Sequence, residues 1–456
     1  MIGAGQAWQV VDRLLARAAR TGVDLQVTLV GEDGNLTRFA GSEIHQNISQ
    51  RDLYVILRAA RGGAVAQVSV HGTDPAVHDR ALDRAVALLA KARPIPGFDA
   101  LPTGSAPEEH SFVAPGAGRV TLAHKAAVVK NAHRIAAEAG ALAYGVFVTG
   151  RTTIAIGSTR GVRSSLEATD ATFETVCAQA EASGYASTSG LDPLRLDVEG
   201  AAREAAEKVA RRGPLDCLPA GEYEVVLEPH AVAEILGQFA YYGASGRVHN
   251  DRMSFLLGRE GQRVFSERVT IRDDGADASR SLPLPFDLEG LPRKAATFVD
   301  RGVFLGAAHD RASVLRTSAP PCALSRSTAG ILGFFGSPPM PLHLSLEPGA
   351  CSAAELVRGI ERGVYVTRLW YVRMQDRIEG VSTGLTRDGT FAIENGEIGR
   401  PLRSARFTQG LSELLTRVTA VSSDGLLHVP TTWFEPRVRI GSWAPALRIA
   451  GMRFTS

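Results

Sequence analysis

The feature that most constrains the fold is a change of hydrophobic spacing near the start of the chain. Residues 7–21 place apolar side chains at helical intervals, and Gly22 then ends that pattern. From residue 24 to residue 71 apolar and polar residues alternate instead, as in strands with one buried face. Turn signals at residues 32–34 and 61–63 divide this stretch. We therefore expect a meander of antiparallel strands that follows a helix.

Helical and strand-like patterns continue to alternate through the first half of the chain. Helical spacing returns over residues 75–93, and it predicts further helices at about 119–140 and 198–212. Residues 94–118 are rich in Pro and Gly, so we expect a long surface loop there. The first part of the chain should therefore combine helices with an antiparallel sheet.

Residues 213–222 carry two prolines and two glycines and form the best candidate for a domain boundary. A strand and a helix should follow, with Pro229 in the first helical turn, where its missing N–H costs nothing. Later residues form short alternating runs, with one short helix near residues 352–363 that begins with a capping box. The predicted fold is α+β, with a mixed N-terminal domain at 1–215 and a mainly β domain at 220–456.

Composition excludes several classes of protein. The chain has 456 residues with 50 basic and 48 acidic side chains, and this balance argues against a nucleic-acid-binding protein. It contains no stretch of about 18 consecutive apolar residues, so we expect no membrane-spanning helix. The N-terminus lacks the pattern of a signal peptide, and the four cysteines form no CxxC pair. These features predict a cytoplasmic location.

Several sequence blocks, in their order along the chain, resemble the TldD/PmbA family. The blocks are TRFAGSEIHQN (37–47), GEYEVVLEP (221–229), RVFSERVTIRDDG (263–275), LHLSLEPGACSAAELVRGIERGVYV (342–366) and DGTFAIENGEIGRPL (388–402). The resemblance implies a peptidase fold in which one kind of subunit, TldD, carries a His-Glu-x-x-x-His zinc motif just after the VVLxP strand. The other kind, TldE/PmbA, keeps the fold and lacks that motif.

In this chain the three functional positions of that motif are Gly237, Gln238 and Tyr242. None is a good zinc ligand, and an amide cannot serve as a general base. The resemblance therefore implies a TldE-like subunit with no catalytic residue and no cofactor of its own. Zinc is expected in a TldD-like partner, within a heterodimer that acts on unfolded or precursor peptides. An extended peptide could bind by adding a strand to a sheet edge.

Four side chains are candidates for a site in this chain. His230 and Glu234 lie four residues apart on the predicted helix, so they share a face. With His249 or His309 they could form a rearranged metal site, although an exposed ion pair is the simpler interpretation. His45 and His343 are candidates for substrate binding, although each could equally be an ordinary polar or structural histidine.

Two alternative functions remain open from the sequence. The chain could be a metallopeptidase in its own right, or a homodimeric module that binds peptides without cleaving them. The apolar, glycine-rich residues 330–336 suggest core or inter-subunit packing. Trp370 and Tyr371, near Tyr365, are interpreted first as strand core and second as an interface.

Overall fold

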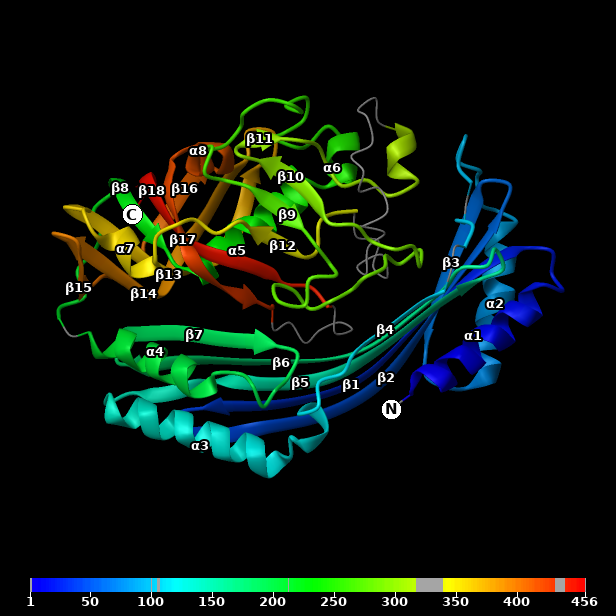
Figure 1. Ribbon diagram of the computed structural model, residues 1–456, viewed down its shortest axis with the longest axis horizontal. Helices are drawn as coiled ribbons and strands as arrows, with labels where there is room; N and C mark the ends of the chain where they lie inside the picture. Colours follow the sequence, from blue (N-terminus) through cyan, green and yellow to red (C-terminus); the bar gives the residue numbers. More distant parts are fainter. Residues whose placement is uncertain are drawn as a thin grey trace.

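The structure, a computed structural model, describes residues 2–99, 101–104, 107–211, 213–316, 339–430 and 439–455. Within these ranges the chain forms two large sheets, one from residues 24–190 and one from residues 221–454 (Figure 1). The predicted fold class is confirmed, because helices and antiparallel strands form the N-terminal part and the C-terminal part is mainly β. The domain limits 1–215 and 220–456 stay a prediction.

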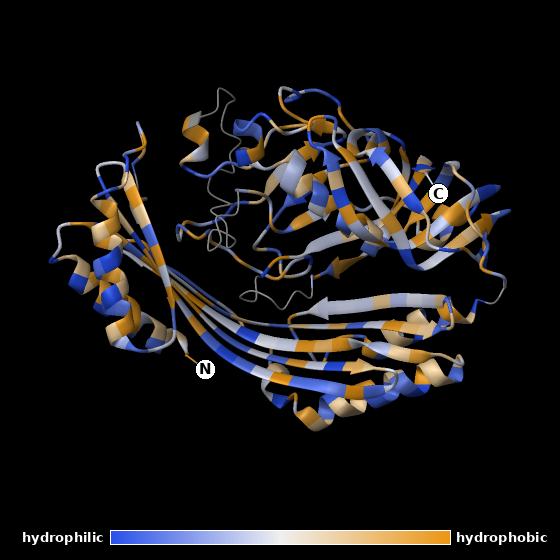
Figure 2. Cartoon of the chain, turned by 180° about the vertical axis from the view of Figure 1, so that it is seen from behind, coloured by the Kyte–Doolittle hydropathy of each residue, from blue (hydrophilic) through white to orange (hydrophobic). Residues whose placement is uncertain are grey.

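The first sheet has the strand order β3-β2-β1-β5-β6-β4, and β7 pairs with β6. All of its pairings are antiparallel except that of β4 with β6. Its strands are β1 (Asp24–Ala40), β2 (Glu43–Arg61), β3 (Ala64–His71), β4 (Glu108–Phe112), β5 (Leu142–Ser158), β6 (Arg163–Gln179) and β7 (Ala182–Gly190). The long strands curve together, and polar and apolar residues alternate along them (Figure 2).

Helices cover this sheet at its two ends (Figure 1). They are α1 (Ala4–Ala18), α2 (Pro75–Leu89), the short 3-10 turn η1 (Ala117–Arg119), α3 (Leu122–Glu138) and α4 (Val198–Ala210). The apolar faces of α1 and α2 pack on β1, β2 and β3 around Leu14, Leu57 and Leu82. Those of α3 and α4 pack on β5, β6 and β7 around Ile135, Phe173 and Ala205. Helix α1 thus buries the stripe that its hydrophobic spacing predicted, whereas α3 buries Val129, Ala132 and Ile135 and leaves the expected Ala123 and Ala127 exposed.

Two details of the predicted N-terminal part are wrong. The expected turn at residues 32–34 lies inside β1, where Gly34 pairs with Gln50 on one side and Gly150 on the other. Hydrogen-bonded pairing with β2 and β5 along both edges of β1 stabilises the extended backbone more than the local sequence favours a turn. The expected loop at 94–118 contains β4 and buries Leu101. The turn at residues 61–63 is confirmed, with Gly62 and Gly63 at positive φ.

The second sheet contains eleven strands within the described ranges. They are β8 (Gly221–Leu227), β9 (Ile271–Asp273), β10 (Ala296–Asp300), β11 (Val303–Phe304), β12 (Leu344–Leu346), β13 (Arg362–Asp376), β14 (Val381–Glu394), β15 (Glu397–Pro401), β16 (Arg406–Gly410), β17 (Val418–His428) and β18 (Ser442–Phe454). Because β18 pairs with both β16 and β8, and β8 pairs with β13, the strands β8, β13, β14, β16 and β18 close into a ring.

Short helices accompany this second sheet. They are α5 (Pro229–Gln238), the π-helical turn η2 (Phe239–Gly243), α6 (Gly246–Asn250), the 3-10 turn η3 (Ser313–Arg316), α7 (Ala353–Val357) and α8 (Leu411–Thr416). The predicted capping box of α7 is confirmed, since Ser352 and Glu355 bond to each other's backbone N–H. The helix itself ends earlier than predicted. The largest apolar core lies between α5 and the strands around it.

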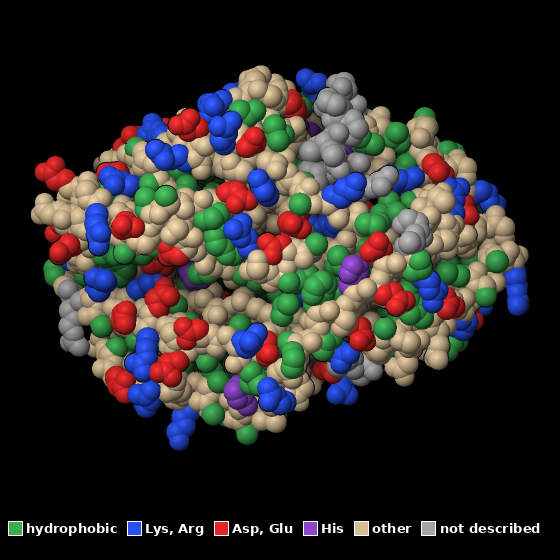
Figure 3. Space-filling view, viewed as in Figure 1, with side chains coloured by type: hydrophobic (Ala, Val, Ile, Leu, Met, Phe, Trp, Pro, Cys, Tyr) green, Lys and Arg blue, Asp and Glu red, His purple; other side chains and the backbone are tan. Residues whose placement is uncertain are grey.

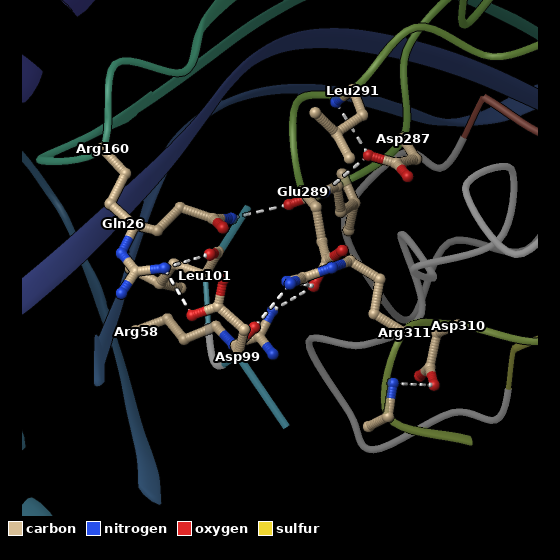
Figure 4. Close-up of polar contacts among 12 residues, drawn as sticks. Gln26, Arg58, Asp99, Leu101, Arg160, Asp287, Glu289, Leu291, Asp310 and Arg311 are labelled. Carbon is tan, nitrogen blue, oxygen red and sulfur yellow. Dashed lines mark hydrogen bonds and ion pairs between the residues drawn. The ribbon is translucent and has the colours of Figure 1, made fainter. Parts of the chain in front are cut away.

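The C-terminal part lies on the concave side of the first sheet (Figure 1), and one of its loops contacts β1 and β2 there (Figure 4). Its Leu288 carbonyl accepts a 2.7 Å hydrogen bond from Gln26 Nε2 of β1. Glu289 forms an ion pair of 3.0 Å with Arg58 of β2, while Phe286 packs into an apolar cluster of that face. These contacts fix the two sheets relative to each other and so position the cleft between them.

Candidate functional site

The helix α5 begins directly after β8, with Glu228 at its N-cap and Pro229 in its first turn, as predicted. Its apolar face, including Val232 and Leu236, is buried in the largest core. The three positions of the zinc motif fall at its C-terminal end, where the backbone changes to the π-helical turn η2. Such turns occur often at functional sites.

These three side chains present no metal-binding geometry. Gly237 is exposed, and a Cβ added there would meet no atom within 4 Å. Gln238 is half-buried, and its Oε1 has no hydrogen-bond partner within the described part of the chain. The Tyr242 ring lies 4.7 Å from the Tyr241 ring and beneath the guanidinium of Arg377. An amide and a stacked phenol do not replace imidazole ligands, so the residues do not fit a zinc ion.

His230 occupies a different environment from the one expected. It is only 2% exposed, so the predicted exposed ion pair with Glu234 is wrong. Its ring packs against Tyr185 of β7, with centroids 4.8 Å apart, and against His428 of β17, with centroids 5.7 Å apart. Burial, and then nearby positive charge, lower the pKa of His230 well below its ordinary value. The imidazole is therefore neutral at pH 7.

The rearranged metal site suggested by the sequence is not assembled. His249 bonds to the Gly243 carbonyl and His309 to Ser313, and neither joins His230. Among the described residues no group of three or more His, Cys, Asp and Glu side chains could hold a metal ion. Positive charge on Arg368 acts on both His230 and His428, which also disfavours a cation between them. Burial raises the pKa of Glu234, so its carboxylate is also weakened as a ligand.

A buried ion pair joins the first sheet to the start of α5. Lys208 of α4 donates to Glu228 at 2.7 Å, to Glu204 at 2.6 Å and to the Tyr185 carbonyl at 2.9 Å. Burial lowers the pKa of Lys208, but the two carboxylates together raise it above its ordinary value. Burial raises the pKa of Glu228, and the charge of Lys208 opposes this shift. The pair fixes the start of α5 against α4, and the hydrogen bond to the Tyr185 carbonyl ties both to β7.

The cleft between the sheets contains a cavity of about 390 Å³ beside this pair. Figure 3 shows this side as a hollow between the two halves of the molecule. Asp388 of β14 lies in the cavity wall, where it accepts from Ser183 at 2.8 Å and from Arg368 Nε at 2.8 Å. The sequence did not indicate these residues, because they come from distant segments and form no local motif.

The two predicted substrate-binding histidines do not come together. His45 is exposed on β2, and three strands separate it from β7, the strand beside the cleft. His343 is fully buried, and both of its ring nitrogens are engaged. Arg293 donates to Nδ1 at 2.8 Å, so Nε2 must carry the proton that it donates to the Arg439 carbonyl at 2.6 Å. This gives His343 a structural position, not the cleft position that the sequence suggested.

Two further predictions have mixed outcomes. Residues 330–336, predicted to pack in the core or between subunits, lie outside the described residues. Trp370 and Tyr371 are 37% and 65% exposed, so their interpretation as strand core is wrong.

The three cysteines within the described ranges are free thiols: Cys177, Cys217 and Cys351. No helix in those ranges is long and apolar enough to cross a membrane.

The chain is thus a two-sheet α+β protein in which Gly237, Gln238 and Tyr242 offer no metal ligands at the end of α5. Residues 220–456, over half of the chain, match the PmbA/TldA metallopeptidase C-terminal domain. The chain therefore belongs to the PmbA/TldD family, as the sequence blocks suggested.

Individual relatives agree with this assignment. A Methanothermobacter thermautotrophicus protein named "Metalloprotease" is 27% identical over 271 residues, which are 58% of this chain and 57% of that protein. A Haemophilus influenzae protein named "Metalloprotease TldD homolog" is 25% identical over 236 residues, 51% of this chain and 48% of its own. This chain thus spans about half the length of these curated relatives. TldE from Thermococcus kodakarensis has a similar fold, with a TM-score of 0.82, 18% identity, and coverage of 98% of this chain and 100% of that one.

Proposed function

We propose that this chain is the non-catalytic, TldE-like subunit of a TldD/TldE-type zinc metallopeptidase. The observation that carries the proposal is the content of the motif at the end of α5. Gly237, Gln238 and Tyr242 stand where a zinc-binding subunit has two histidines and a glutamate. Helix α5 is well packed in this chain, with Glu228 at its N-cap and its apolar face in the largest core, and this supports a subunit that keeps the fold without the zinc ligands.

In this proposal the partner is a TldD-like protein that holds the zinc, and the complex is cytoplasmic. This chain completes a cleft in which an unfolded or precursor peptide is bound before cleavage, in peptide maturation or turnover. The cavity beside Lys208 and Asp388, at the junction of both sheets, supports a role in forming that cleft. The chain supplies no general base and no cofactor.

The test is to measure zinc content and peptidase activity for the purified chain, for a TldD-like protein from the same genome, and for their mixture. We expect neither zinc nor activity for the chain alone, and more cleavage of an unfolded peptide by the mixture than by the partner alone. Co-elution on a sizing column should show the heterodimer. A matched Gly237→Ala variant, which changes an open position, should behave like the wild type.

Other outcomes would support the alternatives. Stoichiometric zinc and cleavage by the lone chain would indicate a metallopeptidase in its own right, and His230 and Glu234 would then be the first residues to replace. A stable homodimer that binds peptides and ignores the TldD-like protein would indicate a peptide-binding module. Either result would overturn the proposal.

A further inference from the structure

The β13–β14 hairpin carries an exposed cluster of aromatic and arginine side chains. We define the aromatic–arginine patch as Trp370, Tyr371, Arg373, Arg377 and Arg387, which lie beside the mostly buried Arg368. The Trp370 and Tyr371 rings lie 5.5 Å apart and are both exposed. Large exposed aromatic residues next to arginine are typical of binding surfaces, which are enriched in these residue types.

The backbone conformation at Tyr371 is strained, although the ring of this residue lies in solvent. Tyr371 has φ of 52°, a left-handed conformation that a bulky residue rarely adopts. It lies at an irregularity in the pairing of β13 with β14, between Trp370 and Arg373. The Tyr371 side chain is 65% exposed, whereas the next residue, Val372, is buried in the largest core. A strained and exposed aromatic residue points to selection for binding.

Three guanidinium groups stack on the two exposed rings. Arg387 and Arg368 lie 4.9 and 5.2 Å from the Trp370 ring, and Arg373 lies 5.4 Å from the Tyr371 ring. Stacking on a ring restrains the guanidinium plane but does not use its N–H groups as donors. The geometry of these N–H groups matches that of a carboxylate. Arg368 and Arg387 already face Asp388. Neither Arg373 nor Arg377 has an ion-pair partner among the residues that the structure describes.

The strand itself also offers backbone groups. β13 pairs with β8 only from Gly363 to Val366. Beyond Val366, the strand pairs only with β14 within the described ranges, so its other edge has no strand partner there. Such an edge can pair with an extended peptide.

We propose that the aromatic–arginine patch and the adjoining edge of β13 bind an extended acidic peptide. Arg373 donates to the Val372 carbonyl and Arg377 contacts the Met253 sulfur, but neither guanidinium has a carboxylate partner among the described residues. The two groups would face the carboxylates of the peptide, and the exposed rings would cover its apolar side chains. A second copy of this chain that bound through the same patch would place arginine against arginine, and these like charges would repel each other. A nucleic acid fits less well, because the whole chain has a net charge of only +2, whereas nucleic-acid-binding proteins usually carry a clear basic excess. The inference does not depend on the proposed function.

The experiment is fluorescence anisotropy with the full-length chain and three labelled probes. The first is a peptide in which Glu alternates with Thr and Val, the second has Lys in place of each Glu, and the third is a single-stranded oligonucleotide. We expect the acidic peptide to bind, with an affinity that falls as salt rises, and the Lys peptide to bind at least about tenfold more weakly. Equal binding of the two peptides, or stronger binding of the oligonucleotide, would overturn the proposal.

Variants then locate the site. Arg373→Glu with Arg377→Glu should weaken binding of the acidic peptide by about tenfold or more. The matched control is Arg20→Glu with Arg268→Glu, which makes the same change of net charge at two exposed arginines away from the hairpin and should leave binding unchanged. Equal losses in both double variants would show that only net charge matters, and this would overturn the assignment of the site.

A third variant separates binding from folding. Tyr371→Gly removes the ring and relieves the left-handed strain, so it should weaken binding while it raises the melting temperature. A purely structural Tyr371 would show the opposite, with a lower melting temperature and unchanged affinity, and that result would also contradict the proposal.

Discussion

Lys208 of α4 and Glu228 at the N-cap of α5 form an ion pair with 2.7 Å between Nζ and Oε2, although each side chain is less than a tenth exposed. Removing one partner of such a pair leaves a buried charge without compensation. We therefore expect Lys208→Met to destabilise the protein by about 3–5 kcal/mol. Thermal unfolding at neutral pH, followed by circular dichroism, would measure the change.

Two further variants control that experiment. Replacing both partners, as Lys208→Met with Glu228→Leu, should restore much of the lost stability, because no buried charge remains. Arg203→Met removes an exposed ion pair with Glu199 on the same helix and should have little effect. If Lys208→Met proved as mild as Arg203→Met, the buried pair would not hold α5 against α4.

We predict that Asp287, in the loop that contacts the first sheet, lowers the stability of the folded protein at high pH (Figure 4). Its Oδ1 accepts from the N–H groups of Glu289 and Leu291, whereas Oδ2 is buried with no partner among the described residues. Burial, and then the charge of Glu289, raise the pKa of Asp287 well above its ordinary value. The folded state therefore keeps a proton that the unfolded state loses above about pH 3.9, so stability falls as pH rises.

Asp287→Asn removes this titration and keeps the acceptor oxygen. We expect the variant to melt higher than the wild type at pH 8.5, with the difference shrinking towards pH 4. Glu289→Gln is a control with an expected shift of opposite sign. It loses the ion pair with Arg58 and should therefore melt lower than the wild type. An Asp287→Asn variant that melts lower than the wild type at pH 8.5 would contradict the raised pKa.

The sequence predicts the elements of the fold better than their exact limits. Hydrophobic spacing located α1, α2, α3 and α4, because a surface helix must bury one stripe of its side chains. It failed at residues 32–34, where strands on both sides carry a turn-like sequence straight through β1. Pairing across the sheet depends on distant residues such as Gln50 and Gly150, and a local pattern contains no information about them.

The candidate site was less predictable than the fold. Gly237, Gln238 and Tyr242, which the resemblance assigned to the motif positions, lie at the end of the helix after β8 and in the turn that follows it. It could not show that His230 would meet His428, since 198 residues of chain separate them. Solvent exposure was the other failure, because His230 is buried and Trp370 is exposed. Burial is decided by which elements pack together, and that is a property of the whole fold.

Gln238 provides a prediction about the chemistry of the complex. In the proposed function its side chain stands at the position of the general base of the zinc-binding subunit, and its Oε1 makes no hydrogen bond in the described part of the chain. We therefore expect Gln238→Ala to leave the activity of the reconstituted complex within about twofold of the wild type, since no step is assigned to it. The measurement is kcat/KM for an unfolded peptide, with co-elution as the control for assembly. A large loss of rate in an intact complex would assign Gln238 a role.

His343 leads to a prediction about acid sensitivity. Burial, and then the charge of Arg293, lower the pKa of His343 to about 3. In the unfolded chain the same imidazole takes up a proton below about pH 6.5, so the folded state loses stability as pH falls from that value towards 3. The slope is about 1.4 kcal/mol per pH unit for this one group.

His343→Gln would remove the titration while it offers an acceptor and a donor of similar polarity to Arg293 and Arg439. We expect the variant to melt lower than the wild type at pH 7.5, because the fit in the buried site is poorer. The gap between the two melting temperatures should narrow as pH falls to 5, since the wild type alone then loses the stability that depends on a neutral His343. Parallel melting curves across this range would mean that His343 is protonated as readily in the folded protein as in the unfolded one, which its hydrogen bond from Arg293 does not allow.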